Sequence, residues 1–223
     1  MRMKMVGRYL LLLFFTIFNC SVTPIPLRSN IMNLELLSHE PGGYRELKSF
    51  QAVHLLSDVT VRFCNRYVEK RSSVQHEMIL AARSGLQNIA EGSLASVTSK
   101  ITELELIRLA RQSLEVLRLD YEDFLHQHNL PLWPYDDRRR KILRKRQCTT
   151  VDEVALWILQ EHNRQTTEQP LSAPSVQTTH ASLPEITANA ALTLTIGACS
   201  LLDRQTRVLE RRIKIKRLTT ELA

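Results

Sequence analysis

The residues most able to do chemistry in this 223-residue chain are clustered arginines and lysines. Seven of the nine residues from Arg138 to Arg146 are basic. Like charges at this density repel one another unless an anion neutralises them, so the cluster favours phosphate binding. A solvated helix or linker that only keeps the protein soluble is the alternative, and both interpretations stay open. The basic residues are Arg138, Arg139, Arg140, Lys141, Arg144, Lys145 and Arg146.

A second basic cluster lies closer to the end of the chain. Arg204, Arg207 and Arg211 are spaced by three and four residues, which places them on one face of a helix. Leu202 and Leu209 lie on the opposite face. Neither basic cluster is interleaved with aromatic residues that could stack on bases, so any nucleic-acid binding would be led by phosphate contacts and weakly sequence-specific.

No pattern of residues predicts catalysis. Serine, histidine and aspartate are present, but the chain has no nucleophile elbow, phosphate-cradling glycine loop or paired-carboxylate motif. His126 and His128 are two residues apart, so on a helix they point to different sides and cannot easily share a metal ion. We therefore expect a protein that is not an enzyme and that uses no metal, cofactor or small-molecule substrate.

The composition favours a helical protein with a charged periphery. Six glycines, eight prolines and 6% aromatic residues are too few for many short strands joined by tight turns. The net charge is +7, while residues 44–135 carry eleven basic and eleven acidic side chains. The excess positive charge therefore lies mainly in the two basic stretches, 138–146 and 204–217. Such a distribution favours polyanionic partners.

The four cysteines and the N-terminus bear on the cellular compartment. Cys20, Cys64, Cys148 and Cys199 show no CxxC motif or pairing rhythm, so we expect free thiols and a cytoplasmic protein. Residues 1–23 nevertheless have the outline of a secretory signal, with a basic start and a ten-residue apolar run that is too short to span a bilayer.

A clear cleavage pattern is missing after that apolar run. The chain is therefore either exported or a cytoplasmic protein whose translation starts at Met32, and the second is our expectation. In both cases residues 1–43 would lie outside the core.

Apolar residues recur every three or four positions in four segments, which predicts four amphipathic helices. Their matching stripes argue for an all-α protein, an antiparallel up-and-down four-helix bundle. The third helix also carries a second apolar row, Leu106, Leu109 and Val116, which suggests self-association or packing against a later insertion. The four stripes span residues 53–67, 78–89, 107–124 and 192–213.

Single residues predict where these helices begin and end. Ser73 is expected to cap the second helix, and Gly92 to end it in a left-handed conformation. Thr98 or Ser99 should begin the third helix, expected to be the longest.

The segment before the last helix reads as an insertion. Thr150 and Glu153 have capping-box spacing and should open a short helix, which a Thr-, Ser- and Pro-rich linker over residues 165–184 follows. The expected organisation is an N-terminal extension (1–43), three bundle helices (44–134), the basic segment with the short helix and linker (135–187), and the final helix with a basic end (188–223).

Residues 81–92, AARSGLQNIAEG, resemble the hallmark of the "four helix bundle protein" family. Thr98-Ser99-Lys100 and Leu114-Glu115 add to the resemblance, which covers residues 44–133, and residues 188–205 are similar to the subgroup with a distinct final helix. Named relatives are the protein encoded by the intervening sequence of bacterial large-subunit ribosomal RNA genes and the accessory variability determinant of diversity-generating retroelements. The motif residues, expected to be structural, are Asn88, Ile89, Ala90, Glu91 and Gly92.

The resemblance implies a homo-oligomeric ring, a pentamer in the structurally known relatives. In the retroelement relative, the basic surface of that ring binds nucleic acid and a reverse transcriptase. We therefore expect a non-catalytic oligomer that binds RNA or RNA/DNA as an accessory to a reverse transcriptase or a ribosomal RNA element. The alternative is a scaffold that binds protein partners through the second apolar row and the inserted helix at residues 154–158.

Overall fold

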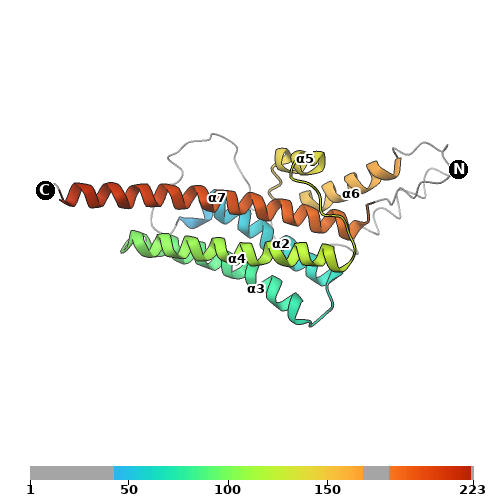
Figure 1. Cartoon of the computed structure of the whole chain (residues 1–223), viewed down its shortest axis with the longest axis horizontal. Helices are drawn as coiled ribbons and strands as arrows, with labels where there is room; N and C mark the ends of the chain where they lie inside the picture. Colours follow the sequence, from blue (N-terminus) through green and yellow to red (C-terminus); the bar gives the residue numbers. More distant parts are fainter. Residues whose placement is uncertain (1–42, 168–180, 222–223) are drawn as a thin grey trace. The chain divides into compact units, whose positions relative to one another are not determined.

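The computed structural model describes residues 43–167 and 181–221, and within them every regular element is a helix (Figure 1). The prediction of an all-α protein is therefore confirmed. The chain divides into two units, residues 1–34 and 35–223, and the described residues all belong to the second unit. The expected N-terminal extension lies outside the described residues, apart from Gly43.

The described chain forms one short 3-10 helix and six α-helices. The last helix has 39 residues and the helix beginning at Lys100 has 28, so the prediction that the third helix is the longest was wrong. The elements are η2 (Tyr44–Glu46), α2 (Lys48–Tyr67), α3 (Ser73–Ala95), α4 (Lys100–Gln127), α5 (Arg138–Arg146), α6 (Val151–Thr167) and α7 (Leu183–Glu221).

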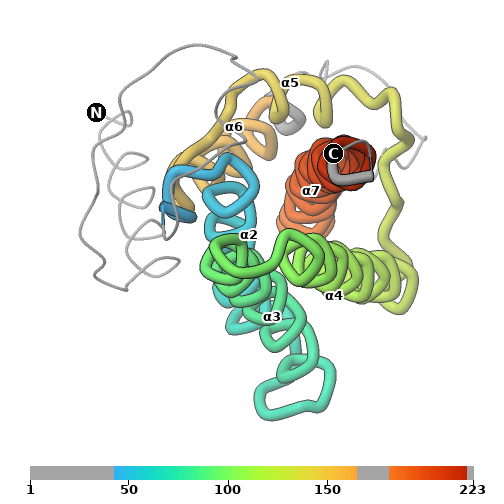
Figure 2. Tube along the Cα trace, turned by 90° about the vertical axis from the view of Figure 1, so that its left-hand side faces the viewer, coloured from blue at the N-terminus to red at the C-terminus, as the bar shows by residue number. Residues whose placement is uncertain are grey.

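Four of these helices pack in a cycle of neighbours. α2 packs on α3 and α7, and α4 also packs on α3 and α7 (Figure 2). The remaining two helices lie against the same core, since α5 packs on α7 and α6 packs on both α7 and α2. The predicted apolar stripes supply the core, in which side chains of all four long helices are fully buried, including Leu56, Ile89, Leu117 and Leu202.

Thr60 is a polar residue in the first apolar stripe, and it can be buried because its hydroxyl is hydrogen-bonded. Tyr121 of α4 donates a hydrogen bond to Thr60 Oγ1 of α2 at 2.9 Å, and Thr60 donates to the Leu56 carbonyl at 2.8 Å. Phe63 packs edge-on against Tyr121 and Phe124, with ring centroids 5.1 and 4.8 Å apart. These side chains therefore join α2 to α4 across the core.

The start of α3 differs by one residue from the prediction. Ser72, not Ser73, is the N-cap, and its Oγ accepts a hydrogen bond from the Gln75 backbone N–H at 3.1 Å. Arg71 has a positive φ of 63°, which turns the chain just before the cap. The prediction for α4 is confirmed at Ser99, whose side chain accepts from Thr102 N.

The predicted end of α3 was wrong, because the helix continues through Gly92 to Ala95. Gly92 is buried, and a β-carbon there would lie 3.4 Å from Leu106 Cβ and 3.5 Å from the Glu103 carbonyl oxygen. Both distances are ordinary van der Waals contacts, so the first turns of α4 lie directly against α3 at this position, where alanine would also fit. Gly92 does not close a helix.

The other motif residues also have structural positions inside α3. Ile89 is fully buried in the core, whereas Glu91 is exposed. Asn88 donates to Ser84 Oγ within the same helix at 3.4 Å, and it is Ser84 that reaches α4, with its Oγ 3.1 Å from Ser113 Oγ.

The segment before the last helix contains more helix than predicted. The capping box is confirmed, because Glu153 N–H donates to Thr150 Oγ1 at 3.3 Å and Thr150 N–H donates to Glu153 Oε2 at 3.4 Å. α6 continues to Thr167, and α7 begins at Leu183, five residues before the predicted boundary at 188. Pro184 is tolerated because it lies in the first helical turn, where N–H groups have no helical acceptor. Most of the predicted linker, residues 168–180, lies outside the described residues.

α7 is long and apolar enough to cross a membrane by length and composition, alone among the helices of the described ranges. In its most apolar window, 67% is buried inside the protein. A core helix passes the same test, and the contacts of α7 with α2, α4, α5 and α6 are those of a core helix.

The position of Gly92 inside a helix leads to a stability prediction. We expect Gly92→Ala to leave stability unchanged or to raise it by up to about 1 kcal/mol, because alanine favours the helix and its β-carbon fits at ordinary contact distance. Gly197→Ala, a mid-helix control with nothing within 4 Å of the added carbon, should raise stability by about 0.5–1 kcal/mol. Urea denaturation measures both, and a loss above about 1 kcal/mol for Gly92→Ala would contradict this placement.

Candidate nucleic-acid interface

The basic run at residues 138–146 forms helix α5 because both of its ends are stabilised. The Asp137 carboxylate is the N-cap and accepts a hydrogen bond from Arg139 N–H at 2.7 Å. A negative charge at this end and positive charges in the last turn both interact favourably with the helix dipole and stabilise the helix. The helix ends at Gln147, which is left-handed with φ 50°.

α5 has an inner and an outer side. Leu143, 1% exposed, is buried on the inner side, and Arg139 and Arg140 lie within a turn of it. The other five basic residues are exposed, and we call them the α5 patch: Arg138, Lys141, Arg144, Lys145 and Arg146.

Arg139, which was predicted to bind nucleic acid, is instead held by contacts within the protein. Its Nη2 lies 2.8 Å from Asp137 Oδ2 and its Nε lies 3.1 Å from Asp137 Oδ1. Its guanidinium carbon stands 4.0 Å from the centroid of the Trp133 ring, and its Nη1 is 3.8 Å from Glu185 Oε1. The hydrogen bond from Arg139 also lowers the pKa of Asp137. This arginine therefore anchors α5.

Arg140, another predicted ligand, is only 5% exposed, and its Nε is buried without a hydrogen-bond partner among the described residues. Burial lowers the pKa of Arg140, while the nearby Asp137 and Glu122 carboxylates act in the opposite direction. Its position on the inner side of α5 removes it from the surface that a nucleic acid could contact directly.

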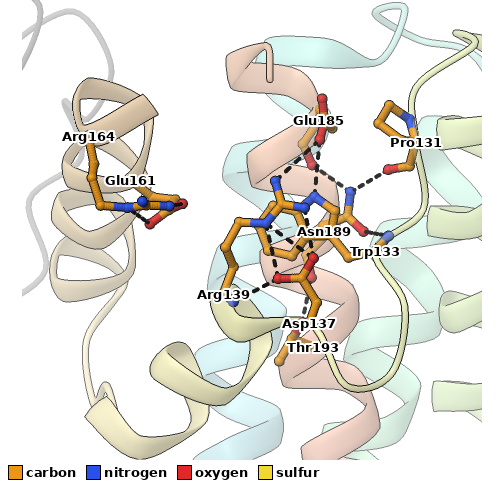
Figure 3. Close-up of polar contacts among 9 residues, drawn as sticks. All are labelled: Pro131, Trp133, Asp137, Arg139, Glu161, Arg164, Glu185, Asn189 and Thr193. Atoms are coloured by element: carbon orange, nitrogen blue, oxygen red, sulfur yellow. Dashed lines mark hydrogen bonds and ion pairs between the residues drawn. The ribbon is translucent and has the colours of Figure 1, made fainter. Parts of the chain in front are cut away.

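A buried polar network fixes the segment that leads into α5 (Figure 3). The Trp133 indole N–H donates to Glu185 Oε1 at 3.0 Å, and the Trp133 backbone N–H donates to Asn189 Oδ1 at 2.8 Å. Asn189 Nδ2 donates to the carbonyl oxygens of Pro131 and Glu185, both at 3.0 Å. Trp133, Glu185 and Asn189 are all at least 95% buried. The network therefore clamps residues 131–133 onto the first turns of α7.

α6 joins this region through aromatic and ionic contacts. Trp157 packs edge-on against Trp133 with ring centroids 6.3 Å apart. Asp152 accepts from Arg62 of α2 at 2.8 Å, and Arg164 pairs with the buried Glu161 (Figure 3). α6 thus braces the network from the side of α2.

This network was not predicted from the sequence. Trp133 and Asn189 are 56 residues apart, and no spacing rule connects them. The available signal was Asn189 itself, a residue whose amide demands hydrogen-bond partners, within the apolar run Ala188-Asn189-Ala190-Ala191.

The second predicted cluster is exposed along α7. Arg204, Arg207 and Arg211 all face solvent, and none has an ion-pair partner in the part of the chain that the structure describes. Asn189 and Arg204 are 15 residues apart, about 22 Å along a helix. The structure therefore does not bring the two basic clusters together at one point.

The remaining reactive groups form no recognisable site. No group of three His, Cys, Asp or Glu residues within the described ranges could hold a metal ion. Cys64, Cys148 and Cys199 are free thiols, and Cys20 lies outside the described residues. Burial raises the pKa of Cys64 to about 12 and that of Cys199 to about 11, so neither is an activated nucleophile.

Asp120 is the other perturbed acid. Its Oδ2 is buried without a hydrogen bond, and burial, with Glu77 and Asp123 nearby, raises its pKa to about 6. No described base or nucleophile is hydrogen-bonded to it.

No family model matches this sequence, and comparisons with curated proteins and with solved structures also give no match. The basic surface and its supporting network are therefore the observations from which a function can be argued.

The network predicts a large effect of one amide. We expect Asn189→Ala to lower the free energy of unfolding by about 2–4 kcal/mol, because the Trp133 N–H and the Pro131 carbonyl would be left without their partner. Urea denaturation measures the change. The matched control is Asn65→Ala at an exposed position, expected to stay within about 0.5 kcal/mol of the parent protein. Equal effects of the two substitutions would contradict the role of the network.

Proposed function

We propose that this chain is a non-catalytic nucleic-acid-binding protein built on an antiparallel up-and-down four-helix bundle of α2, α3, α4 and α7. Two ion pairs support the direction of α4 against α7. Arg108 pairs with Glu210 at 2.7 Å, and Arg111 pairs with Asp203 at 3.0 Å. From the first pair to the second, the residue number increases in α4 and decreases in α7. This is the order expected of antiparallel neighbours.

The observation that carries the nucleic-acid proposal is the α5 patch. Arg138, Lys141 and Lys145 are three and four residues apart, so they form one row half a turn away from the buried Leu143. None of these three has an ion-pair partner within the described ranges. Their mutual repulsion is relieved when phosphates replace the counterions around them.

The anchoring of α5 adds to this proposal. A helix held by the Trp133 network presents its cations without an ordering cost at the moment of binding. The apolar anchor Leu143 and the ion pair of Arg139 would be unnecessary for a basic segment that served only solubility.

The family resemblance adds two further parts to the proposal, a ring of several copies and a reverse transcriptase or ribosomal RNA element as partner. Leu80 of α3 and Leu109 and Val116 of α4 are 54%, 47% and 51% exposed. They flank the contact between Ser84 and Ser113, so an apolar strip runs along the outside of α3 and α4. Such a strip favours self-association, and a ring would repeat the α5 patch and raise its avidity.

The second candidate function is a protein scaffold that binds no nucleic acid, and the same apolar strip favours it. The inserted helix does not contribute as expected, because Val154, Trp157 and Ile158 are buried within this chain. Docking on an apolar strip would be insensitive to salt, whereas phosphate binding weakens steeply as ionic strength rises.

The α5 patch predicts a specific loss of binding. Replacing Arg138, Lys141 and Lys145 together by Gln should weaken retention of a structured RNA at least tenfold at about 0.1 M salt, because three phosphate contacts are lost. The plot of log affinity against log salt should become less steep by about 2 to 3 units. Fluorescence anisotropy over a salt series measures both, and circular dichroism checks that the fold is intact.

The control variant is Lys48, Lys70 and Arg83 to Gln, which removes the same charge from exposed positions away from α5. It should keep most of the affinity. If the α5 variant binds as tightly as this control variant, the nucleic-acid proposal is wrong.

A further inference from the structure

Positions seven residues apart on α7 keep the same orientation toward the core. Ala188, Thr195, Leu202 and Leu209 follow one another at this spacing and are at most 2% exposed. A straight helix would drift by about 20° every seven residues, and the constant burial shows that the packed helix follows its neighbours instead. Each row of seven-spaced residues therefore faces one direction along the whole contact.

A second row of α7 faces α4. Asn189 binds the Trp133 segment that follows α4, and Asp203 and Glu210 pair with α4 arginines. These three residues are separated by multiples of seven. This row is therefore the edge of the contact between α7 and α4, and the rows next to it on the far side from the core lie outside that contact.

The next two rows lie on the side of α7 away from the core, and their character changes along the helix. In the first half, Ile186, Ala190 and Thr193 are buried, at 0%, 0% and 3% exposure. α5 and α6 pack on α7, and Figure 2 shows α5 on the side of α7 opposite α3, with α6 next to it on the side of α2. These two helices and the segment entering α5 cover the first half of the outer face.

In the second half, the same two rows are open and basic. Arg204 and Arg211 continue the row of Ala190, while Arg207 and Lys214 continue the row of Thr193, and all four are exposed. We call these four residues the α7 row. The α7 row therefore lies on the face of α7 that α5 covers further along.

The α5 patch and the α7 row are two cationic clusters at different heights on the outer side of α7. Arg139 near the start of α5 lies 3.8 Å from Glu185 of α7. From Glu185 the α7 row begins 19 residues further on, at Arg204, and ends 29 residues further on, at Lys214, which is about 28 to 44 Å of helix. The acids of the neighbouring row, Asp203 and Glu210, are already paired with arginines of α4 and do not cancel the charge. α5 packs on α7, so the α5 patch lies about one helix diameter, ~10 Å, above the surface of α7. An elongated ligand that touches both would therefore lie at an angle to the axis of α7.

We propose that this face binds one double-stranded nucleic acid along α7, with the α5 patch and the α7 row contacting phosphates about one helical turn apart. This inference rests on the proposed function and names the ligand class for the same surface. One turn of duplex DNA is about 34–36 Å, which lies in the middle of this range of distances.

The residues of this face favour a duplex over a single strand. Single-strand binding without sequence preference depends on aromatic side chains that stack on unpaired bases. Of the Phe, Tyr and Trp side chains that the structure describes, Tyr135 alone is exposed, and Arg144 lies over its ring with the guanidinium carbon 5.5 Å from the centroid. The α7 row has no aromatic neighbour of this kind.

The test compares two cluster variants on three probes. The variants are the α5 variant defined above and an α7 variant with Arg204, Arg207 and Arg211 replaced by Gln, with the Lys48, Lys70 and Arg83 variant as the control. The probes are a DNA duplex of 24 base pairs, a duplex of 8 base pairs that is about 27 Å long and cannot reach both clusters, and a single strand of 24 nucleotides. Anisotropy titrations at fixed salt give each affinity.

On the long duplex, the α5 and α7 variants should each bind at least tenfold more weakly than the control. On the short duplex, each should lose only about twofold, because the remaining cluster still offers a site. The parent protein should bind the single strand at least tenfold more weakly than the long duplex.

The outcomes separate this inference from the proposed function. If the α7 variant binds the long duplex like the control while the α5 variant is weakened, the shared face is wrong and the proposed function stands. Equal affinity of the parent protein for single strand and duplex would overturn the choice of ligand. If both variants bind every probe like the control, the shared face and the proposed function both fail.

Discussion

The arrangement of this protein depends on the need to satisfy the polar groups around the buried Trp133. After α4, Pro131 and Leu132 are exposed and the chain turns inward at Trp133, where a buried backbone N–H without a partner would cost about 1–3 kcal/mol. Asn189 supplies the acceptor for Trp133 N–H and a donor for the Pro131 carbonyl. Because one amide serves both groups, the path of the chain between α4 and α5 is tied to one position on α7.

This constraint sorts the basic residues of α5. Trp133 beneath Arg139, and Asp137 beside it, convert one cation into an anchor, and Leu143 turns the opposite side of the helix outward. The exposed cations then occupy fixed positions on the outer side of α5. Charge that reads as a simple run in the sequence becomes a directional surface only through the buried network.

The helices could be predicted from the sequence because each buries a stripe with a regular period, as Met78, Ile89 and Leu114 do. Positions set by close approach of two helices could not be predicted. Gly92 is of a residue type that often ends helices, and its place inside α3, packed against α4, is apparent only in the structure. For the same reason Arg139 and Arg140 could not be told from their exposed neighbours, since their role depends on contacts with Trp133 and with the interior.

Amide hydrogen exchange of the backbone N–H of Trp133 tests the central constraint most directly. Trp133 lies outside any helix and its N–H is bonded to the Asn189 side chain, so its protection reports on the network and not on helical hydrogen bonds. We expect the Trp133 N–H to exchange as slowly as the amides of Leu117 and Leu202 in the core, through global unfolding. Exchange near the rate of an unfolded peptide, while those core amides remain protected, would contradict this expectation.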